Sequence, residues 1–449
     1  MNLFKSFFVK TIITLGDKLM GSKYVKTILE WNAFDKMSEK ELDEIQKKGL
    51  KSIINHAFHT VPYYKEYFNN ITTNVSIKDF PILTKELLRE QKERLISNEF
   101  SENMLQKNYS SGSSGIQSFS FSEKKHKYFL QGIQSHWYLW SGYKIGNPVL
   151  QFGISPKRTF PKNIKDLLYN VHYLNSFSLD KQDHLHTIQT VKNKKIEYII
   201  GYPSAINEFA KVMIEAGENH TIKGIISLGD KLFPHFKNNF NKAFNTPKII
   251  DTYGCAEGLL MACSNDLEYY YIMSPHVYIE IVDDFGNEVN DGQLGHVLVT
   301  SLTNKAMPMI RYKLGDLAIK LPREKYPKDR KFNYPLLEKI VGRETDVILT
   351  PNGKTLIVHS FTGIVEYYPE IKQYKITQNE LDSILFEYIT DENFNFTEAS
   401  LLSIQKEIDL LTAGTLEIKF EKVASIKASP SGKPQIIESS LKKINSYTS

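Results

Sequence analysis

The sequence predicts an α/β protein with two domains: a large N-terminal domain, in which mixed sheets are flanked by helices, and a small α+β C-terminal domain. The chain has 449 residues, more than a single hydrophobic core usually organises. Hydrophobic residues make up 41% and charged residues 24%, which is ordinary for a globular protein. Short apolar runs alternate with helical patterns, as is typical of an α/β domain with largely buried sheets.

Capping and apolar spacing predict the first helices. Ser38 and Glu41 form a capping box at the start of a helix over 38–60, which Pro62 stops. A second helix is expected from Thr84 through Leu95. A third helical pattern is formed by the phenylalanines at positions 233, 236, 240 and 244.

Six short apolar runs predict strands. They are PVLQFGI near 148, IEYII at 196, IKGIISL at 222, PKIID at 247, VYIEIVD at 277 and HVLVTSL at 296. Residues 118–122 alternate serine with phenylalanine, the period of a half-buried strand.

A change of texture after Gly342 predicts the domain boundary. A hairpin turn on Asn352 and Gly353 follows it, and then an alternating, charged segment. We therefore divide the chain into a large domain, 1–344, and a small domain, 345–449.

Residues 1–37 form a basic amphipathic segment within the large domain. Lys5 and Lys10 interrupt its apolar runs and no small-residue cleavage site follows, so it is expected to be neither a signal peptide nor a membrane span. It could rest on a membrane surface. Packing against its own core is the favoured expectation.

Charge and cysteine content exclude several classes of protein. The net charge of +5 comes from 56 basic and 51 acidic residues that are interspersed, so no nucleic-acid partner is expected. Two cysteines, Cys255 and Cys263, provide no disulfide framework and favour the cytoplasm. With His276 they make only an incomplete and irregular zinc set.

The tract SSGSSG at 110–115 allows two interpretations. Serine and glycine have little to bury, so the tract could be a flexible linker. However, backbone N–H groups in a tight glycine turn, with hydroxyls beside them, form a concavity that suits a polyphosphate. The strand that follows immediately favours the second interpretation.

The segment IIDTYGCAEG at 249–258 ends a buried-type strand, where α/β proteins place ligands. Gly254 would let the backbone approach a planar base, Tyr253 offers a stacking face, and Glu257 offers a carboxylate to Mg²⁺. The alternative is an ordinary turn with a solvated glutamate.

Three later segments carry charged candidates. RYKLGDLAI at 311–319 contains Arg311 and Asp316, and a carboxylate after a glycine turn can accept both hydroxyls of a ribose. The alternative is a surface hairpin with a salt bridge. VGRETDVIL adds Arg343, and SPSGKP puts Lys433 on a loop tip, where it is either solvated or a mobile cation for a charged transition state.

In this order, SSGSSG, YGCAEG, RYKLGDL, GRETD and SGK resemble the motif series of the adenylate-forming enzymes, the superfamily of acyl-CoA synthetases, nonribosomal-peptide adenylation domains and luciferases. The resemblance extends from about Asn55 to the C-terminus. NHAFHTVPYYKEYF, FPILTKELLRE and the stretch 227–258 look like the phenylacetate-CoA ligase family. ILTPNGKTL resembles its branch of capsular polysaccharide biosynthesis proteins. The resemblance implies the adenylate-forming enzyme fold.

It also implies a role for each candidate. The ATP phosphates would be held by Ser110, Ser111, Gly112, Ser113, Ser114 and Gly115. Adenine would be flanked by Gly229, Asp230, Lys231, Tyr253 and the adjoining Gly254. Asp316 and Arg343 would hold the ribose, and Glu257 would bind Mg²⁺. Lys433 would be the catalytic lysine, and the acyl pocket would be lined by Tyr202, Pro203 and Ser204.

The activity implied is ATP-dependent formation of an acyl-adenylate, followed by transfer to a thiol, with coenzyme A as the expected co-substrate. Two alternatives stay open: transfer to an amine or hydroxyl in surface polysaccharide biosynthesis, and a non-catalytic ATP-binding protein. Ile116 and Gln117 replace the usual Lys-Pro after the phosphate loop, and Thr345 replaces a common hinge aspartate. Neither the acid nor the oligomeric state is predicted.

Overall fold

The computed structural model describes the greater part of the chain. The described residues are 2–69, 75–109, 119–153, 159–175, 181–255, 257–343, 347–352, 355–365, 367–368, 370–390, 396–426 and 436–441.

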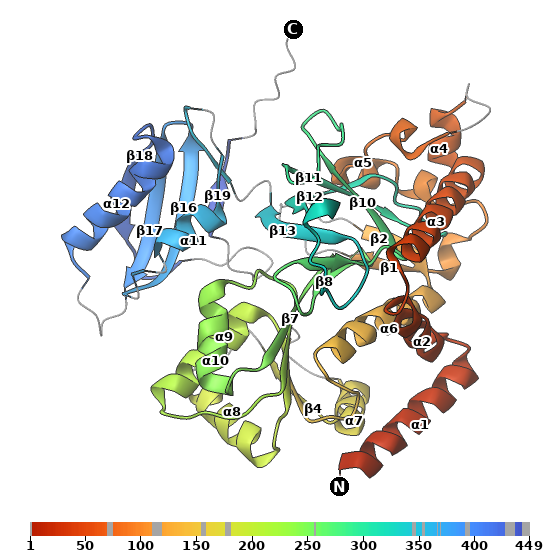
Figure 1. Cartoon of the computed structure of the whole chain (residues 1–449), viewed down its shortest axis with the longest axis horizontal. Coiled ribbons are helices and arrows are strands. Elements are labelled where there is room, and N and C mark those ends of the chain that lie inside the picture. The colour runs from red at the N-terminus through yellow and green to blue at the C-terminus, as the bar shows by residue number, and fades with distance from the viewer. Residues whose placement is uncertain are drawn as a thin grey trace.

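A mixed sheet of eleven strands, counted over the described residues, forms the centre of the large part of the molecule (Figure 1). The strand order is β10-β11-β12-β13-β9-β8-β7-β6-β5-β3-β4. Their bounds are β3 Val149–Gly153, β4 Val171–Asn175, β5 Tyr198–Gly201, β6 Gly224–Ser227, β7 Lys248–Cys255, β8 Leu259–Ser264, β9 Tyr270–Ile272, β10 Val277–Val282, β11 Leu294–Ser301, β12 Tyr312–Lys320 and β13 Leu336–Arg343.

The sheet changes from parallel to antiparallel at β7. Strands β4, β3, β5, β6 and β7 pair in parallel, and β7 then pairs antiparallel with β8. The parallel strands β5 and β6 are buried along their whole length, as expected for short apolar runs covered on both faces. All six strands predicted from apolar runs are present.

Helices cover the sheet and form the N-terminal end of the chain. Those of the large part are α1 Asn2–Met20, α2 Tyr24–Phe34, α3 Glu39–Thr60, α4 Pro62–Tyr67, α5 Lys85–Glu90, α6 Lys124–Trp140, α7 Phe160–Tyr169, α8 Lys181–Asn193, α9 Pro203–Glu215 and α10 Pro234–Phe244. Short 3₁₀ helices are η1 Ile77–Asp79, η2 Lys92–Leu95, η3 Glu102–Met104 and η4 Arg323–Lys325.

The predicted capping box of α3 is confirmed. Ser38 Oγ accepts from the backbone N–H of Glu41, and the Glu41 carboxylate accepts from the backbone N–H of Ser38. Pro62 follows the end of α3 and is also the first residue of α4, a position that tolerates proline because no helical hydrogen bond is lost. The third helix, α10, is also present, with Phe233 as its N-cap.

Two predictions for the N-terminal half need correction. The helix expected over 84–95 is broken at Gln91 into α5 and η2, which lets the adjacent Leu95 and Ile96 both be buried. The strand expected over 118–122 is present as β2, Phe119–Glu123, and it pairs with β1, Leu105–Tyr109. It is not half-buried, however, because Ser120, Phe121 and Ser122 are all buried.

The C-terminal part has its own sheets and core. Strands β14 Val347–Leu349 and β15 Thr355–Ile357 form the predicted hairpin. A four-stranded sheet has the order β18-β17-β16-β19, with bounds β16 Ile371–Glu380, β17 Ser383–Thr390, β18 Glu417–Lys422 and β19 Ile437–Ser439. Helices α11 Val358–Val365 and α12 Glu398–Thr412 accompany it.

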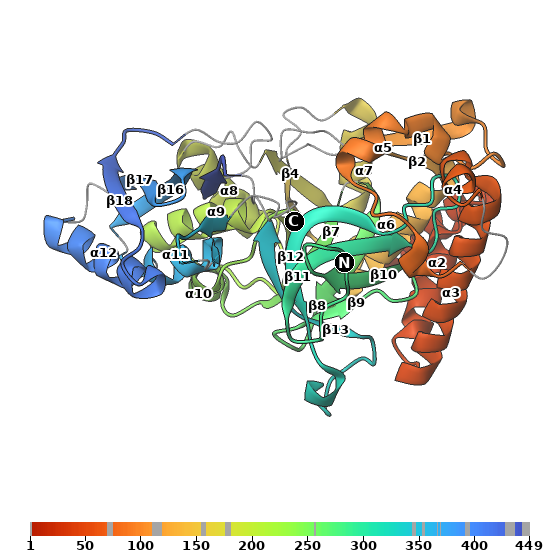
Figure 2. The same cartoon turned by 90° about the horizontal axis from the view of Figure 1, so that it is seen from above.

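The two parts meet beside α10. Phe233 belongs to the same buried cluster as Ile348, Phe361 and other residues of the C-terminal part. Both views place α11 next to α10 (Figures 1 and 2). The boundary expected near residue 344 falls between the eleven-stranded sheet and β14. Residues 344–346 lie outside the described residues.

The N-terminal helix α1 extends from the body of the molecule (Figure 1). Its apolar residues Ile12, Leu15, Leu19 and Met20 are 39–87% exposed. The expectation that the segment 1–37 packs against its own core is therefore wrong for residues 12–20 of α1, whereas in α2 Trp31 is buried in a core cluster. Among the described helices, none combines the length and apolar character that crossing a bilayer requires.

Candidate functional site

Three of the predicted segments follow neighbouring parallel strands. Residues 202–204 follow β5, residues 229–231 follow β6, and Glu257 comes just after β7. Because β5, β6 and β7 pair in parallel, their carboxyl ends meet at one edge of the sheet. The local sequence explains why the chain leaves β5 after Gly201, since Pro203 is the first helical residue of α9.

The first two segments are in direct contact. Ser204 Oγ donates a 2.5 Å hydrogen bond to Asp230 Oδ2. Gly229 has φ of +86°, and a Cβ there would lie 2.4 Å from Cε1 of Tyr202, so only glycine fits against the Tyr202 ring. The predicted acyl-pocket segment and the predicted adenine segment are thus packed together.

Tyr253 connects β7 to the predicted ribose pair. Its hydroxyl donates a 2.8 Å hydrogen bond to Asp316 Oδ2, across 63 positions of sequence. Asp316 on β12 is the register partner of Arg343 on β13, which brings the backbones of these two residues side by side. The structure describes no side-chain geometry for Arg343.

Glu257 is buried and held at two points. The Tyr312 hydroxyl donates a 3.0 Å hydrogen bond to its Oε1 atom, and Ser120 Oγ donates a 2.7 Å hydrogen bond to its backbone oxygen. The side chain of Glu257 is 5% exposed and that of Tyr312 is fully buried. The carboxylate is therefore held by a residue of β12 and the backbone by a residue of β2.

The predicted phosphate tract and the predicted lysine lie outside the described residues. This applies to positions 110–115 and to Lys433. The strands that flank the tract are described: Tyr109 pairs with Phe119, and Ser120, the next residue, contacts Glu257. The strands on either side of the tract, β1 and β2, therefore pair with each other. Strand β2 is also hydrogen-bonded to Glu257 through Ser120.

Two other candidates have structural contacts. Lys231 Nζ donates a 2.8 Å hydrogen bond to the backbone oxygen of Val341 and lies 5.7 Å from the centre of the Phe233 ring. Gly254 lies at a β-bulge where β7 pairs with β8, and a Cβ there would be 3.0 Å from the backbone oxygen of Leu259. A larger residue would crowd this turn.

The cysteines do not form a metal site with His276. Over the described residues, no group of three or more His, Cys, Asp and Glu side chains is suited to hold a metal ion. Burial, together with the Glu257 carboxylate nearby, raises the pKa of the Cys255 thiol well above its ordinary value. A protonated thiol is a poor metal ligand and a poor nucleophile.

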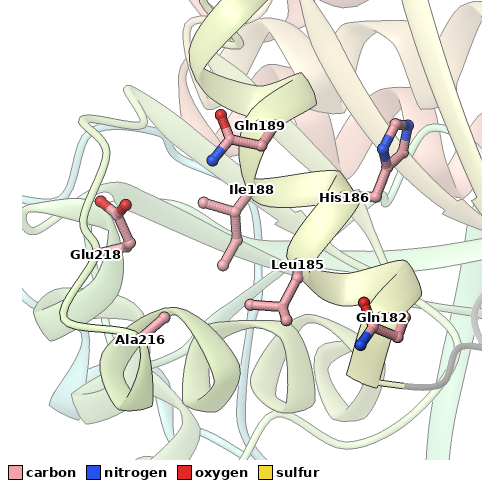
Figure 3. A pocket seen from close by; sticks show the side chains of 7 residues that line it. All are labelled: Gln182, Leu185, His186, Ile188, Gln189, Ala216 and Glu218. Carbon is pink, nitrogen blue, oxygen red and sulfur yellow. The ribbon is translucent and has the colours of Figure 1, made fainter.

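A hollow of about 390 Å³ lies elsewhere, at α8 and the end of α9 (Figure 3). None of the predicted site residues lines it. The lining residues are Gln182, Leu185, His186, Ile188, Gln189, Ala216 and Glu218. Nothing in this lining resembles the chemistry predicted from the motifs.

Sequence comparisons agree with this arrangement. Residues 170–304 match the AMP-binding enzyme family. The chain is 21% identical to Protein CapK of Staphylococcus aureus over 97% of each chain. It is 25% identical to a phenylacetate-coenzyme A ligase of Aromatoleum evansii, covering 70% of this chain and 73% of that enzyme.

A solved structure shares the fold at low sequence identity. A 2-hydroxyisobutyryl-CoA ligase in the postadenylation state has a TM-score of 0.72 with 16% identity, covering 90% of this chain and 91% of the ligase. The same ligase in the thioesterification state, bound to its adenylate and CoA, has a TM-score of 0.57.

The fold, the strand-end site and these similarities define an adenylate-forming ligase. The chain is similar to proteins of the adenylate-forming superfamily, among them phenylacetate-CoA ligases and Protein CapK. The predicted fold class, the resemblance and the assignment as an enzyme are thereby confirmed.

Sequence reasoning missed two residues of the site. Tyr312 and Ser120 contact Glu257, but neither was singled out. Tyr312 stands inside the motif RYKLGD, and Ser120 stands in the alternating stretch 118–122 that follows the serine tract. Their position next to other motif residues was the available signal.

Proposed function

We propose that the protein uses ATP to activate a carboxylic acid as an acyl-adenylate, releasing pyrophosphate, and then transfers the acyl group to the thiol of coenzyme A. The observation that carries this proposal is the hydrogen bond from Tyr253 to Asp316. It joins two motif segments that are far apart in sequence, at the sheet edge beside Glu257.

The first step needs positioning and neutralisation of charge. A carboxylate and the α-phosphate of ATP are both anionic, so their approach is opposed electrostatically. No general base is required, because the attacking oxygen is already ionised. Lys433 would bridge the carboxylate and the α-phosphate as charge develops there.

The other residues would hold ATP and the acid. Residues 110–115 would donate N–H and O–H groups to the β- and γ-phosphates. Asp316 and Arg343 would hold the ribose, Gly229, Asp230, Lys231 and Tyr253 would flank adenine, and Tyr202, Pro203 and Ser204 would line the acyl pocket. Burial, with the Asp230 charge nearby, raises the pKa of Tyr202, so its hydroxyl stays neutral.

Glu257 would hold Mg²⁺, which offsets phosphate charge when bound. A single fixed carboxylate fits this ion, because Mg²⁺ in nucleotide sites takes most of its ligands from phosphates and water. The hydrogen bond from Tyr312 orients this carboxylate, as outer-sphere partners of metal ligands commonly do.

For the second step we propose that the small domain, residues 345–449, rotates about the linker near 344 and opens a path for the thiol. The TM-score is 0.72 with the postadenylation state of one ligase and 0.57 with its thioesterification state. This difference supports the view that the present arrangement corresponds to the postadenylation state, before the rotation.

An amine or hydroxyl acceptor in surface polysaccharide biosynthesis is the second candidate. The similarity to Protein CapK, which spans 97% of both chains, favours it. Analysis of the products separates the two. Formation of an acyl-CoA thioester from the acid, ATP and coenzyme A supports the first, whereas pyrophosphate release with no loss of the coenzyme A thiol supports another acceptor.

Replacing Lys433 tests the proposal. A panel of carboxylic acids is first screened for ATP-dependent pyrophosphate release. Lys433→Ala is then expected to lower the rate by about 10²- to 10³-fold, because a preorganised cation at the transition state is lost. Lys422→Ala, an exposed lysine on β18, is the matched control and should leave the rate unchanged. Equal rates of pyrophosphate release in the two variants would contradict the proposed mechanism.

A further inference from the structure

The helix α7 is exposed along most of its length, and its apolar residues are among those exposed. Phe160, Ile164, Leu167 and Leu168 are 40–76% exposed. Their spacing of i, i+4, i+7 and i+8 places them on one side of the helix. In an amphipathic helix of a globular protein this side is expected to face the core, whereas in α7 it is exposed.

The helix α1 presents a second apolar side. Ile12, Leu15, Leu19 and Met20 follow the spacing i, i+3, i+7 and i+8, and all are exposed. The start of α2, which follows α1, lies within electrostatic range of the end of α7. Burial raises the pKa of Tyr24, at the start of α2, and Tyr169, the last residue of α7, raises it further. Only a nearby group has such an effect.

Exposed lysines surround this end of the molecule. Lys18 and Lys23 flank the junction of α1 and α2. Met20 lies 3.9 Å from the Tyr128 hydroxyl of α6, whose first turn carries Lys124, Lys125 and Lys127. The acidic Asp17 is already engaged, since it accepts hydrogen bonds from the backbone N–H groups of Tyr24 and Val25. The acidic Glu123 immediately precedes Lys124.

We propose that α1 and α7, with these lysines, form a surface that docks on a membrane containing anionic lipids. We call it the α1/α7 surface, made of residues 12, 15, 19 and 20 of α1, residues 160, 164, 167 and 168 of α7, and Lys18, Lys23, Lys124, Lys125 and Lys127. Amphipathic helices with apolar residues beside lysines lie in the plane of such membranes. The proposal does not depend on the ligase activity.

Charge favours a lipid surface over a second copy of the chain. A two-fold dimer joins the same surface of both copies, so the lysines of one copy would face those of the other. Anionic headgroups instead provide the opposite charge, and each lysine near them adds attraction.

Vesicle flotation with the purified full-length protein tests the proposal. The vesicles contain phosphatidylcholine alone or with about 30% phosphatidylglycerol. We expect binding to the anionic vesicles, and a loss of about tenfold or more in apparent affinity with phosphatidylcholine alone or at high salt. Failure of the wild-type protein to bind either kind of vesicle would overturn the proposal.

Paired substitutions locate the surface. Leu15→Glu with Leu19→Glu, and Phe160→Glu with Leu167→Glu, are each expected to weaken binding about tenfold or more, because charge replaces inserted apolar groups. Leu410→Glu on α12 is the matched control, since Leu410 and Leu167 are equally exposed at 75%. Circular dichroism verifies that each variant is folded.

Two outcomes contradict the proposal. Equal loss of binding in Leu410→Glu would show that the α1/α7 surface has no special role. A wild-type dimer that the paired variants dissociate, together with no vesicle binding, would assign this surface to a second copy of the chain.

Discussion

Glu257 depends on residues that the motifs themselves do not indicate. Its Oε1 atom accepts a hydrogen bond from Tyr312, and its backbone oxygen accepts one from Ser120. Both donors are buried, so Tyr312 orients the carboxylate while Ser120 holds the backbone. If Glu257 binds Mg²⁺, Tyr312 is a positioning residue for the ion, because it acts through the carboxylate.

Replacing Tyr312 with phenylalanine tests this role. Tyr312→Phe removes the donor and keeps the ring, so we expect the Mg²⁺ concentration for half-maximal ATP binding to rise about tenfold. Calorimetric ATP binding at several Mg²⁺ concentrations measures this without reference to turnover.

Tyr334→Phe is the matched control for Tyr312→Phe. Tyr334 is also fully buried, and its hydroxyl donates to Asp35, a residue outside the predicted site. It should lose about 1 kcal/mol of stability without a change in the Mg²⁺ dependence. Equal Mg²⁺ dependence in both variants would show that Tyr312 has only a structural role.

At the scale of residues, the candidate site residues could be predicted from the sequence, but the residues that contact them could not. Tyr253, Glu257 and Asp316 were selected because each stands near a strand end or a glycine turn with a side chain suited to a nucleotide. The structure brings these three segments together. Tyr312 was not selected, since its contact with Glu257 spans 55 positions and depends on how β12 approaches β7.

At the scale of elements, the site is an edge of three parallel strands. Gly229, just after β6, has φ of +86° and packs against the Tyr202 ring, just after β5. The loops therefore fit together only if position 229 has no side chain. This contact joins the predicted adenine and acyl segments.

Gly229→Ala tests that fit. The added Cβ would lie 2.4 Å from the Tyr202 ring, so the two loops must separate. We expect a loss of stability of about 1 kcal/mol or more from the positive φ and an ATP affinity about tenfold weaker from the displaced loops. Thermal unfolding and equilibrium ATP binding measure the two effects.

Gly217→Ala separates backbone strain from the clash. Gly217 also has a positive φ, of +67°, but nothing lies within 4 Å of an added Cβ. Its alanine variant should lose similar stability and keep its ATP affinity. If Gly229→Ala also kept its ATP affinity, the contact with Tyr202 would be irrelevant to nucleotide binding.

Local signals predicted elements well where the sequence alone determines them. The capping box of α3 is an example, as are the apolar runs of β5 and β6. The predictions were wrong where contacts with distant parts of the chain determine the local structure. The helix expected over 84–95 breaks at Gln91, where the two segments bury different residues, and β2 is buried on both sides because Ser120 reaches the Glu257 segment.

At the scale of the whole molecule, the large and small parts are joined by a small apolar contact. Phe233, the N-cap of α10, is 8% exposed and lies in the buried cluster of the C-terminal part. Phe236 packs against the same cluster. A contact of this kind can hold one arrangement of the parts and still be broken when they rotate.

Removing the Phe233 ring should therefore loosen the arrangement. In Phe233→Ala the buried ring is lost at the contact, so we expect a stability loss of about 3 kcal/mol. We also expect a larger radius of gyration by small-angle scattering, because the two parts separate more often. Pyrophosphate release should slow, since Lys433 would reach the nucleotide less often.

Phe244→Ala distinguishes loosening from simple destabilisation. Phe244 ends the same helix, is fully buried, and packs only within a cluster of the large part among the described residues. Its loss should cost similar stability and leave the scattering unchanged, because no contact between the parts is removed. If both variants, measured while folded, scattered like the wild type, Phe233 would not hold the parts together, and the arrangement would have to depend on other contacts, such as the packing of Phe236 against the cluster of the C-terminal part.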